Sequence, residues 1–148
     1  MNGPSYRFRL ERVRALRERR EDQAKLELVS AMQQQEYCRQ ELTAAETRIA
    51  DARRSQLESA TSSASELLAR QAYLERTESA HRSTLDDLER HDAQVAQRRD
   101  ALTQAAQARR ALERLKEKGL AAHRRELERI ERFQLDEIAI NGYRRGTA

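Results

Sequence analysis

Glycine and proline are missing from a long stretch of this chain: residues 5 to 118 contain neither. These two residue types most often interrupt helices, and good helix formers such as Ala, Leu, Glu, Gln and Arg fill the stretch instead. The sequence therefore predicts an all-α protein, best interpreted as a rod of long helices.

Large apolar and aromatic residues are scarce as well. The chain has no Trp, 2 Phe and 4 Tyr, and 36% of its residues are charged. Much of the 38% hydrophobic content is Ala, so a thick globular core is not expected, and this composition is typical of a coiled coil. Disorder is the alternative, but disordered segments are usually richer in Pro, Gly and Ser.

Cysteine is limited to Cys38, so no internal disulfide can form and a reducing compartment is permitted. No apolar run is long enough to cross a membrane, and the Arg-containing N-terminus lacks the apolar region of a secretory signal. We therefore expect a cytoplasmic protein without direct membrane insertion.

Residues that could carry catalysis are present but not in catalytic patterns. His81, His91 and His123 do not fall on adjacent helical turns, and most carboxylates lie near Arg or Lys at helical spacing, which is typical of a solvated face. No phosphate-binding glycine loop is present. We predict no catalytic residues, no metal site and no cofactor, and hence no enzyme.

An apolar seam with alternating steps of three and four residues occupies the first half of the chain. Its positions are Leu28, Ala31, Gln35, Cys38, Leu42, Ala45, Ile49 and Ala52. A period of about 3.5 residues is the signature of a left-handed coiled coil. Upstream, Leu10, Val13 and Leu16 are expected to continue the stripe.

A second apolar column recurs every seven residues in the second half: Leu67, Leu74, His81, Leu88, Val95 and Leu102. Between the two stripes lies a Ser/Thr-rich segment, in which Ser63 and Glu66 have the spacing of a capping box. We place a turn at about residues 60–64, although one continuous helix with a weak point is the alternative. Two stripes joined by a short turn favour pairing within one chain, as an antiparallel coiled-coil hairpin.

The expected architecture is a single coiled-coil domain over residues 1–148, with helix one at about 6–60 and helix two at about 64–140. Laid antiparallel, helix one reaches only to about Lys118, and Asn141–Gly142 is predicted to cap helix two. The second helix therefore overhangs and exposes apolar residues, which usually mark a binding surface. These residues are Leu120, Leu127, Ile130, Phe133, Leu135 and Ile138.

Charge is distributed unevenly along the chain. Residues 1–20 carry a net charge of +5 and residues 109–148 a net charge of +4, whereas residues 21–108 carry −5. A hairpin brings both basic segments to its open end, which predicts an acidic partner there.

Two other protein classes share some of these features. A basic segment before a coiled coil also occurs in DNA-binding zippers, but the Ala-rich seam and the antiparallel pairing argue against a nucleic-acid partner. A purely structural coiled coil that self-associates through the overhang is the other class. We expect the free protein to be a monomer.

Three segments resemble the signature of the flagellar export protein FliJ family. They are Arg109–Lys118, the segment Phe133–Ala139 followed by Tyr143, and the opening Tyr6–Leu10. The length and the unequal two-arm layout are similar too, so the resemblance spans nearly the whole chain.

The resemblance implies a component of the flagellar type III export apparatus, at the inner face of the cytoplasmic membrane. Such proteins resemble the stalk of rotary ATPases: they insert into the hexameric export ATPase ring, promote its assembly and link it to the export-gate membrane protein and to export chaperones. An equivalent stalk of a virulence-type injectisome is the alternative.

The resemblance and the basic open end together give candidate binding residues. For the ATPase ring they are Arg7, Arg9, Arg12, Arg109, Leu112, Leu115, Lys116, Lys118, Arg124, Arg125, Leu127, Ile130, Leu135, Asp136 and Ile138. For the export gate, the resemblance implies Tyr73, Thr77, Ala80 and Thr84, although the two threonines depart from the family pattern.

Overall fold

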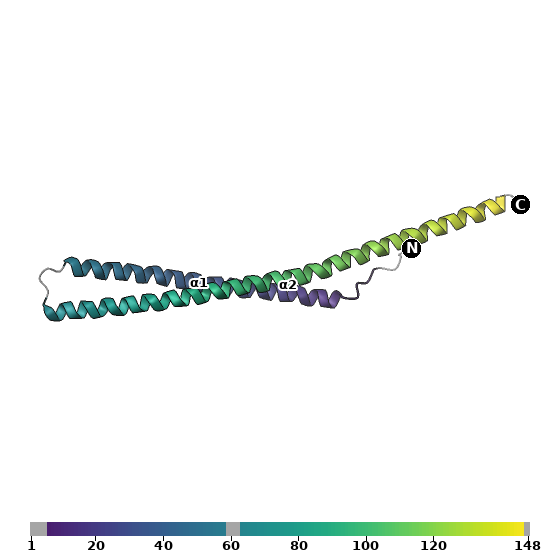
Figure 1. Ribbon diagram of the computed structural model, residues 1–148. Helices are drawn as coiled ribbons and strands as arrows, with labels where there is room; N and C mark the ends of the chain where they lie inside the picture. Colours follow the sequence, from purple (N-terminus) through teal and green to yellow (C-terminus); the bar gives the residue numbers. More distant parts are fainter. Residues whose placement is uncertain (1–5, 59–62, 147–148) are drawn as a thin grey trace. The chain divides into compact units, whose positions relative to one another are not determined.

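The protein consists of two helices in the computed structural model, which describes residues 6–58 and 63–146 (Figure 1). Helix α1 spans Glu11–Glu58 and has 48 residues, and helix α2 spans Ala64–Gly146 and has 83 residues. The prediction of an all-α antiparallel hairpin with a longer second helix is confirmed. Neither helix, over the described residues, contains an apolar stretch suited to crossing a membrane.

The start of α2 has the predicted capping box. The backbone N–H of Ser63 donates to Glu66 Oε2 at 3.3 Å, and the backbone N–H of Glu66 donates to Ser63 Oγ at 3.3 Å. Each side chain thus satisfies a backbone group that the helix end leaves without a partner. Most of the turn predicted at about residues 60–64 lies outside the described residues.

Helix α1 begins at Glu11, later than the expected start at about residue 6. Residues 6–10, called the strap below, are not helical. The backbone N–H of Glu11 donates to Phe8 O at 3.2 Å and that of Arg14 to Leu10 O at 2.9 Å, which forms the first turn. A carboxylate in the first turn interacts favourably with the positive end of the helix dipole, so Glu11 suits this starting position.

The helix cap predicted at Asn141–Gly142 is wrong. Helix α2 continues through both residues to Gly146, and no described residue has a positive φ, the conformation that a glycine cap of this kind needs. Glycine within a helix costs only about 1 kcal/mol relative to alanine. A glycine without a packing partner therefore does not by itself end a long helix.

The chain divides into two compact units. Unit 1 comprises Met1–Glu21 and Gln104–Ala148, and unit 2 comprises Asp22–Thr103. In unit 2 the predicted first seam faces inward: Ala31, Cys38 and Ala45 are buried, and the remaining seam positions are half-buried. From the second column, Val95 is the most buried of the core residues, with 3% of its surface exposed.

Polar contacts in unit 2 give the direction of pairing. Arg53 of α1 pairs with Glu78 of α2 at 2.8 Å, Glu46 with His81 at 3.5 Å, and Gln35 donates a hydrogen bond to Asp92. Partner numbers in α2 rise as those in α1 fall, which defines an antiparallel pair. The apolar core of the unit is thin, because five of the eight positions of the first seam are Ala, Gln or Cys.

Val95 should therefore contribute more to stability than any exposed valine. Val95→Ala removes two buried carbon atoms and is expected to lower the free energy of unfolding by about 1–2 kcal/mol, as measured by urea denaturation. Val29 is 52% exposed, so Val29→Ala is the matched control and should change that free energy by less than about 0.5 kcal/mol. Equal effects of the two substitutions would show that the seam is not formed as described.

Candidate partner-binding site

Unit 1 contains all the residues that were predicted to bind the ATPase ring. Arg7, Arg9 and Arg12 belong to its N-terminal segment, and the rest of that set, from Arg109 to Ile138, belongs to its C-terminal segment. The four predicted export-gate residues lie in unit 2 instead.

The seam of unit 1 is charged rather than apolar. When the steps of three and four are continued backwards from Leu28, they pass Ala24 of unit 2 and reach Glu21, Arg17 and Arg14 of unit 1, which are buried or half-buried. The expected continuation through Leu10, Val13 and Leu16 is wrong, since these side chains are 38%, 39% and 47% exposed. The seam keeps its period, and polar residues occupy its positions.

On α2 the column of seven-residue steps also becomes polar. After Leu102 it reaches Arg109, Lys116 and His123, and all three are half-buried. Long basic side chains can lie along a helix surface with their alkyl stems covered, which makes such positions tolerable for them.

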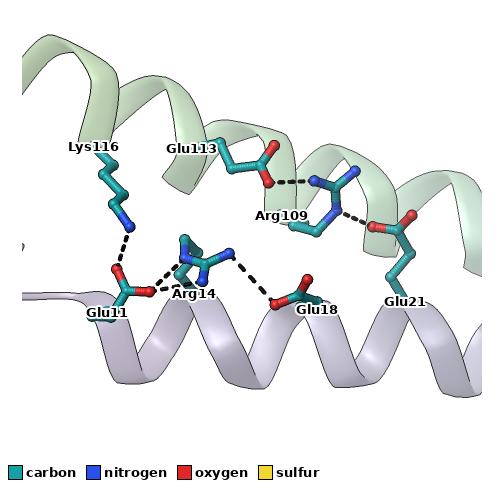
Figure 2. A network of polar contacts seen from close by, with 7 residues as sticks. All are labelled: Glu11, Arg14, Glu18, Glu21, Arg109, Glu113 and Lys116. Carbon is teal, nitrogen blue, oxygen red and sulfur yellow. Dashed lines mark hydrogen bonds and ion pairs between the residues drawn. The ribbon is translucent and has the colours of Figure 1, made fainter.

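Four of these seam residues, Arg14, Glu21, Arg109 and Lys116, form two groups of ion pairs with three further glutamates, together called the ion network (Figure 2). Arg109 donates to both Glu21 and Glu113, and Glu21 is the only charged residue among those described that is buried. Lys116 Nζ lies 2.8 Å from Glu11 Oε2, and Arg14 bonds Glu11 at 2.7 Å and Glu18 at 3.5 Å. Two of the contacts, Glu11–Lys116 and Glu21–Arg109, join α1 to α2.

The ion network shifts the pKa values of Glu11, Arg14 and Arg109. The hydrogen bond from Arg14, followed by that from Lys116, lowers the pKa of Glu11 from 4.5 to about 2. Glu11 in turn raises the pKa of Arg14, and hydrogen bonds to Glu21 and then Glu113 raise the pKa of Arg109. Glu11, Arg14 and Arg109 therefore stay charged throughout the neutral range.

Arg109 and Lys116 thus have a different role from that of the exposed cations. Because both are held by carboxylates, they join the two helices and contribute little uncompensated positive charge. By contrast Arg7, Arg9 and Arg12 are exposed, and no ion pair joins any of them to another residue within 6–58 or 63–146.

The exposed arginines and α2 line two open clefts. One, of about 780 Å³, is lined by Arg7, Arg9, Arg12 and Lys116 together with Tyr6, Phe8 and Glu11. The other, of about 680 Å³, includes Leu115 and Lys118 of α2 beside the strap. An anionic group in these clefts would meet the exposed arginines of the N-terminal segment together with Lys118 of α2.

Beyond His123 no described residue of the N-terminal segment covers α2. Residues 124–146, called the overhang below, are exposed except for the half-buried Leu127, and Figure 1 draws this part of α2 in yellow-green to yellow. Phe133, Leu135 and Ile138 are 70%, 65% and 67% exposed, and Ile130 is 43% exposed. Such a helix face is typical of a surface that packs on a partner.

The predicted export-gate residues form a row along α2 in unit 2. Tyr73 and Ala80 are exposed, and Thr77 and Thr84 are half-buried. The hydroxyl of Thr77 donates to Tyr73 O at 2.9 Å and that of Thr84 to Ala80 O at 3.0 Å. With these hydroxyl protons used within the helix, the row offers mainly the Tyr73 ring and small apolar groups.

Two features of unit 1 escaped the sequence analysis. The ion network has no apolar signal in the sequence, although strict continuation of the seam steps reaches Glu21 and Arg14. The packing of Tyr6 against Gly119 and His123 has no comparable signal, because it joins a non-helical segment to a distant helix.

The fold and this end of the molecule define a class: a helical hairpin whose basic, partly uncovered end is suited to binding a partner. A family model described as "Flagellar FliJ protein" matches residues 6–148. The chain therefore belongs to the FliJ family, whose members are stalk-like proteins related to flagellar export. No curated protein and no solved structure matches the chain.

The lowered pKa of Glu11 predicts a dependence of stability on pH. A carboxylate with a lower pKa in the folded protein stabilises it above its unfolded pKa, and this contribution is lost as the pH falls through the folded value. The urea midpoint should therefore fall between about pH 5 and pH 2, and Glu11→Gln should make that fall smaller.

The matched control is Glu137→Gln, on the exposed overhang and outside the ion network. It should keep the pH dependence of the unsubstituted protein. An unchanged pH profile for Glu11→Gln would mean that the Glu11 ion pairs do not hold the two helices together.

Proposed function

We propose that this chain is a non-enzymatic coupling component of the flagellar type III export apparatus, and that unit 1 inserts into the hexameric export ATPase ring. In this role it promotes assembly of the ring and couples it to the export-gate membrane protein and to export chaperones. The protein acts in the cytoplasm, peripheral to the inner face of the membrane, and is a monomer when free.

The observation that carries the proposal is that unit 1 combines exposed cations with an uncovered apolar helix face. Exposed cations from both ends of the chain lie beside an uncovered helix with an apolar face. The cations match acidic groups in a ring opening, and the uncovered face can be buried only by a partner. Either feature alone is common on coiled coils, whereas the two together fit the insertion of unit 1 into a ring.

The residues divide into three roles in this proposal. The exposed cations meet acidic ring loops and set the rate of encounter with the ring. They are Arg7, Arg9, Arg12, Lys118, Arg124 and Arg125. The apolar contacts come from Leu112, Leu115, Leu127, Ile130, Leu135 and Ile138, and the carboxylate of Asp136 adds a polar contact beside them. Arg109 and Lys116 act through the ion network, which keeps unit 1 folded.

Binding to the export gate is assigned to the row Tyr73, Thr77, Ala80 and Thr84. Because this row lies in unit 2, it does not compete for the residues that bind the ring. One chain can then contact the ATPase and the gate with separate surfaces, as a coupling component must.

Charge reversal tests the proposed contact with the ring. The variant Arg7→Glu, Arg9→Glu, Arg12→Glu should bind the export ATPase of the same organism about tenfold more weakly at low salt, and its affinity should vary less with salt. Binding is measured by surface plasmon resonance at several ionic strengths.

The matched control reverses three exposed arginines of unit 2, Arg48, Arg82 and Arg99, which changes the net charge equally. Its affinity for the ATPase should stay close to that of the unsubstituted protein. Equal losses in the two variants would reduce the effect to net charge, and unchanged binding by both would refute insertion through unit 1.

A purely structural role through self-association is the second candidate, because the exposed apolar face of the overhang would also suit a second copy. Analytical ultracentrifugation separates the two candidates. A stable dimer independent of concentration supports self-association, and a monomer supports the coupling role.

A further inference from the structure

Gly119 lies in the interior of α2, where glycine is unfavourable and no backbone reason requires it. No glycine in the described residues has a positive φ, so any residue would fit this backbone, and alanine would favour the helix. What requires glycine is space. A Cβ at position 119 would overlap the hydroxyl of Tyr6 and lie 3.0 Å from its Cζ and 3.4 Å from its Cε2.

The two other glycines of α2 lack such a neighbour. A Cβ at Gly142 or Gly146 would meet nothing within 4 Å. Gly119 is therefore distinguished by the notch that it leaves on the surface of the helix, into which the end of the Tyr6 side chain fits.

Tyr6 also reaches the next helical turn. Its ring centroid lies 5.7 Å from that of His123, with the ring planes inclined by 38°. Since His123 follows Gly119 by four residues, both lie on one face of α2. Lys116, three residues before Gly119, binds Glu11 at 2.8 Å. The strap is thus held at its start by Tyr6 and just after its end by Glu11.

Docking of the strap on α2 brings positive charges close together. The docked strap places Arg7 and Arg9 along a cleft that also includes the cation Lys118 of α2. Repulsion among these cations opposes docking, and Tyr6 supplies an uncharged contact that offsets it. Docking also extends the cover on α2 as far as His123, so the strap determines where the overhang begins.

We propose that Tyr6 and Gly119 form a clasp, and that this clasp assembles the cationic clefts that receive a carboxylate-rich segment of the partner. Tyr6 and Gly119 are positioning residues here: the contact with the acidic segment is made by Arg7, Arg9 and Lys118. The identity of the partner rests on the proposed function, whereas the clasp itself is a property of the free chain.

The clasp is tested first in the free, full-length protein by NMR of the carbon-bound imidazole protons of His123. Tyr6→Ala should shift these signals, because the aromatic ring is removed. In a Gly119→Ala background the same Tyr6→Ala substitution should have no effect, since the added methyl group has already displaced the ring.

The matched control is Gly142→Ala, which makes the same change in the same helix where nothing lies near the new methyl group. In that background Tyr6→Ala should shift the His123 signals as it does in the unsubstituted protein. Equal shifts in the Gly119→Ala and Gly142→Ala backgrounds would overturn the clasp.

A compensating pair separates a specific fit from general damage to the helix. Tyr6→Phe removes the hydroxyl group that a Cβ at position 119 would overlap, so the combination with Gly119→Ala should return the His123 signals towards their original positions. If the His123 signals of the double variant do not return, the fit of Tyr6 into the notch at Gly119 is contradicted.

Affinity for the export ATPase is the second readout. Gly119→Ala should weaken binding about threefold to tenfold, because the strap must then be ordered during association, and Tyr6→Phe should restore it. If Gly119→Ala releases Tyr6 but leaves the affinity unchanged, the clasp does not assemble the binding site. If the unsubstituted protein does not bind the ATPase, the proposed function fails while the NMR experiment still decides on the clasp.

Discussion

The regular spacing of seam residues on α1 and α2 is the constraint on which the rest of the structure depends. Two long amphipathic helices joined by a short connection bury each other only in antiparallel register, and this register brings the basic first residues to the basic part of α2 in unit 1. The pairing also leaves the last part of α2 without cover. The gathering of basic residues in unit 1 and the uncovered end of α2 both follow from the antiparallel register.

The chemistry of the seam differs between the two units. In unit 2 it is apolar and thin, with Ala31, Cys38, Ala45 and Val95 buried. In unit 1 ion pairs such as Glu21–Arg109 replace the apolar contacts. Partly buried ion pairs add little net stability but fix the register, since a shifted pair leaves charges without partners. The end that is proposed to bind a partner is therefore ordered by specific contacts rather than by a large core.

Much of this architecture was predictable because it depends on local periodicity. The steps through Leu28 and Ile49 located the first seam, and the Ser63–Glu66 spacing located the start of α2. The polar part of the seam was missed because Glu21 and Arg14 do not look like core residues. The Tyr6–Gly119 contact could not be predicted, because it depends on the path of five non-helical residues. The cap at Gly142 was wrong because glycine ends a helix only where a left-handed conformation is favoured.

Antiparallel pairing within one chain is tested most directly by the distance between spin labels at positions 20 and 110, both exposed in unit 1, with Cys38 replaced by alanine. Labelled protein is diluted with unlabelled protein so that only distances within one chain are measured. Neighbouring helices lie about 10 Å apart, so the account predicts a label distance below about 25 Å. A distance near about 135 Å, as in one continuous helix at 1.5 Å per residue, would contradict it.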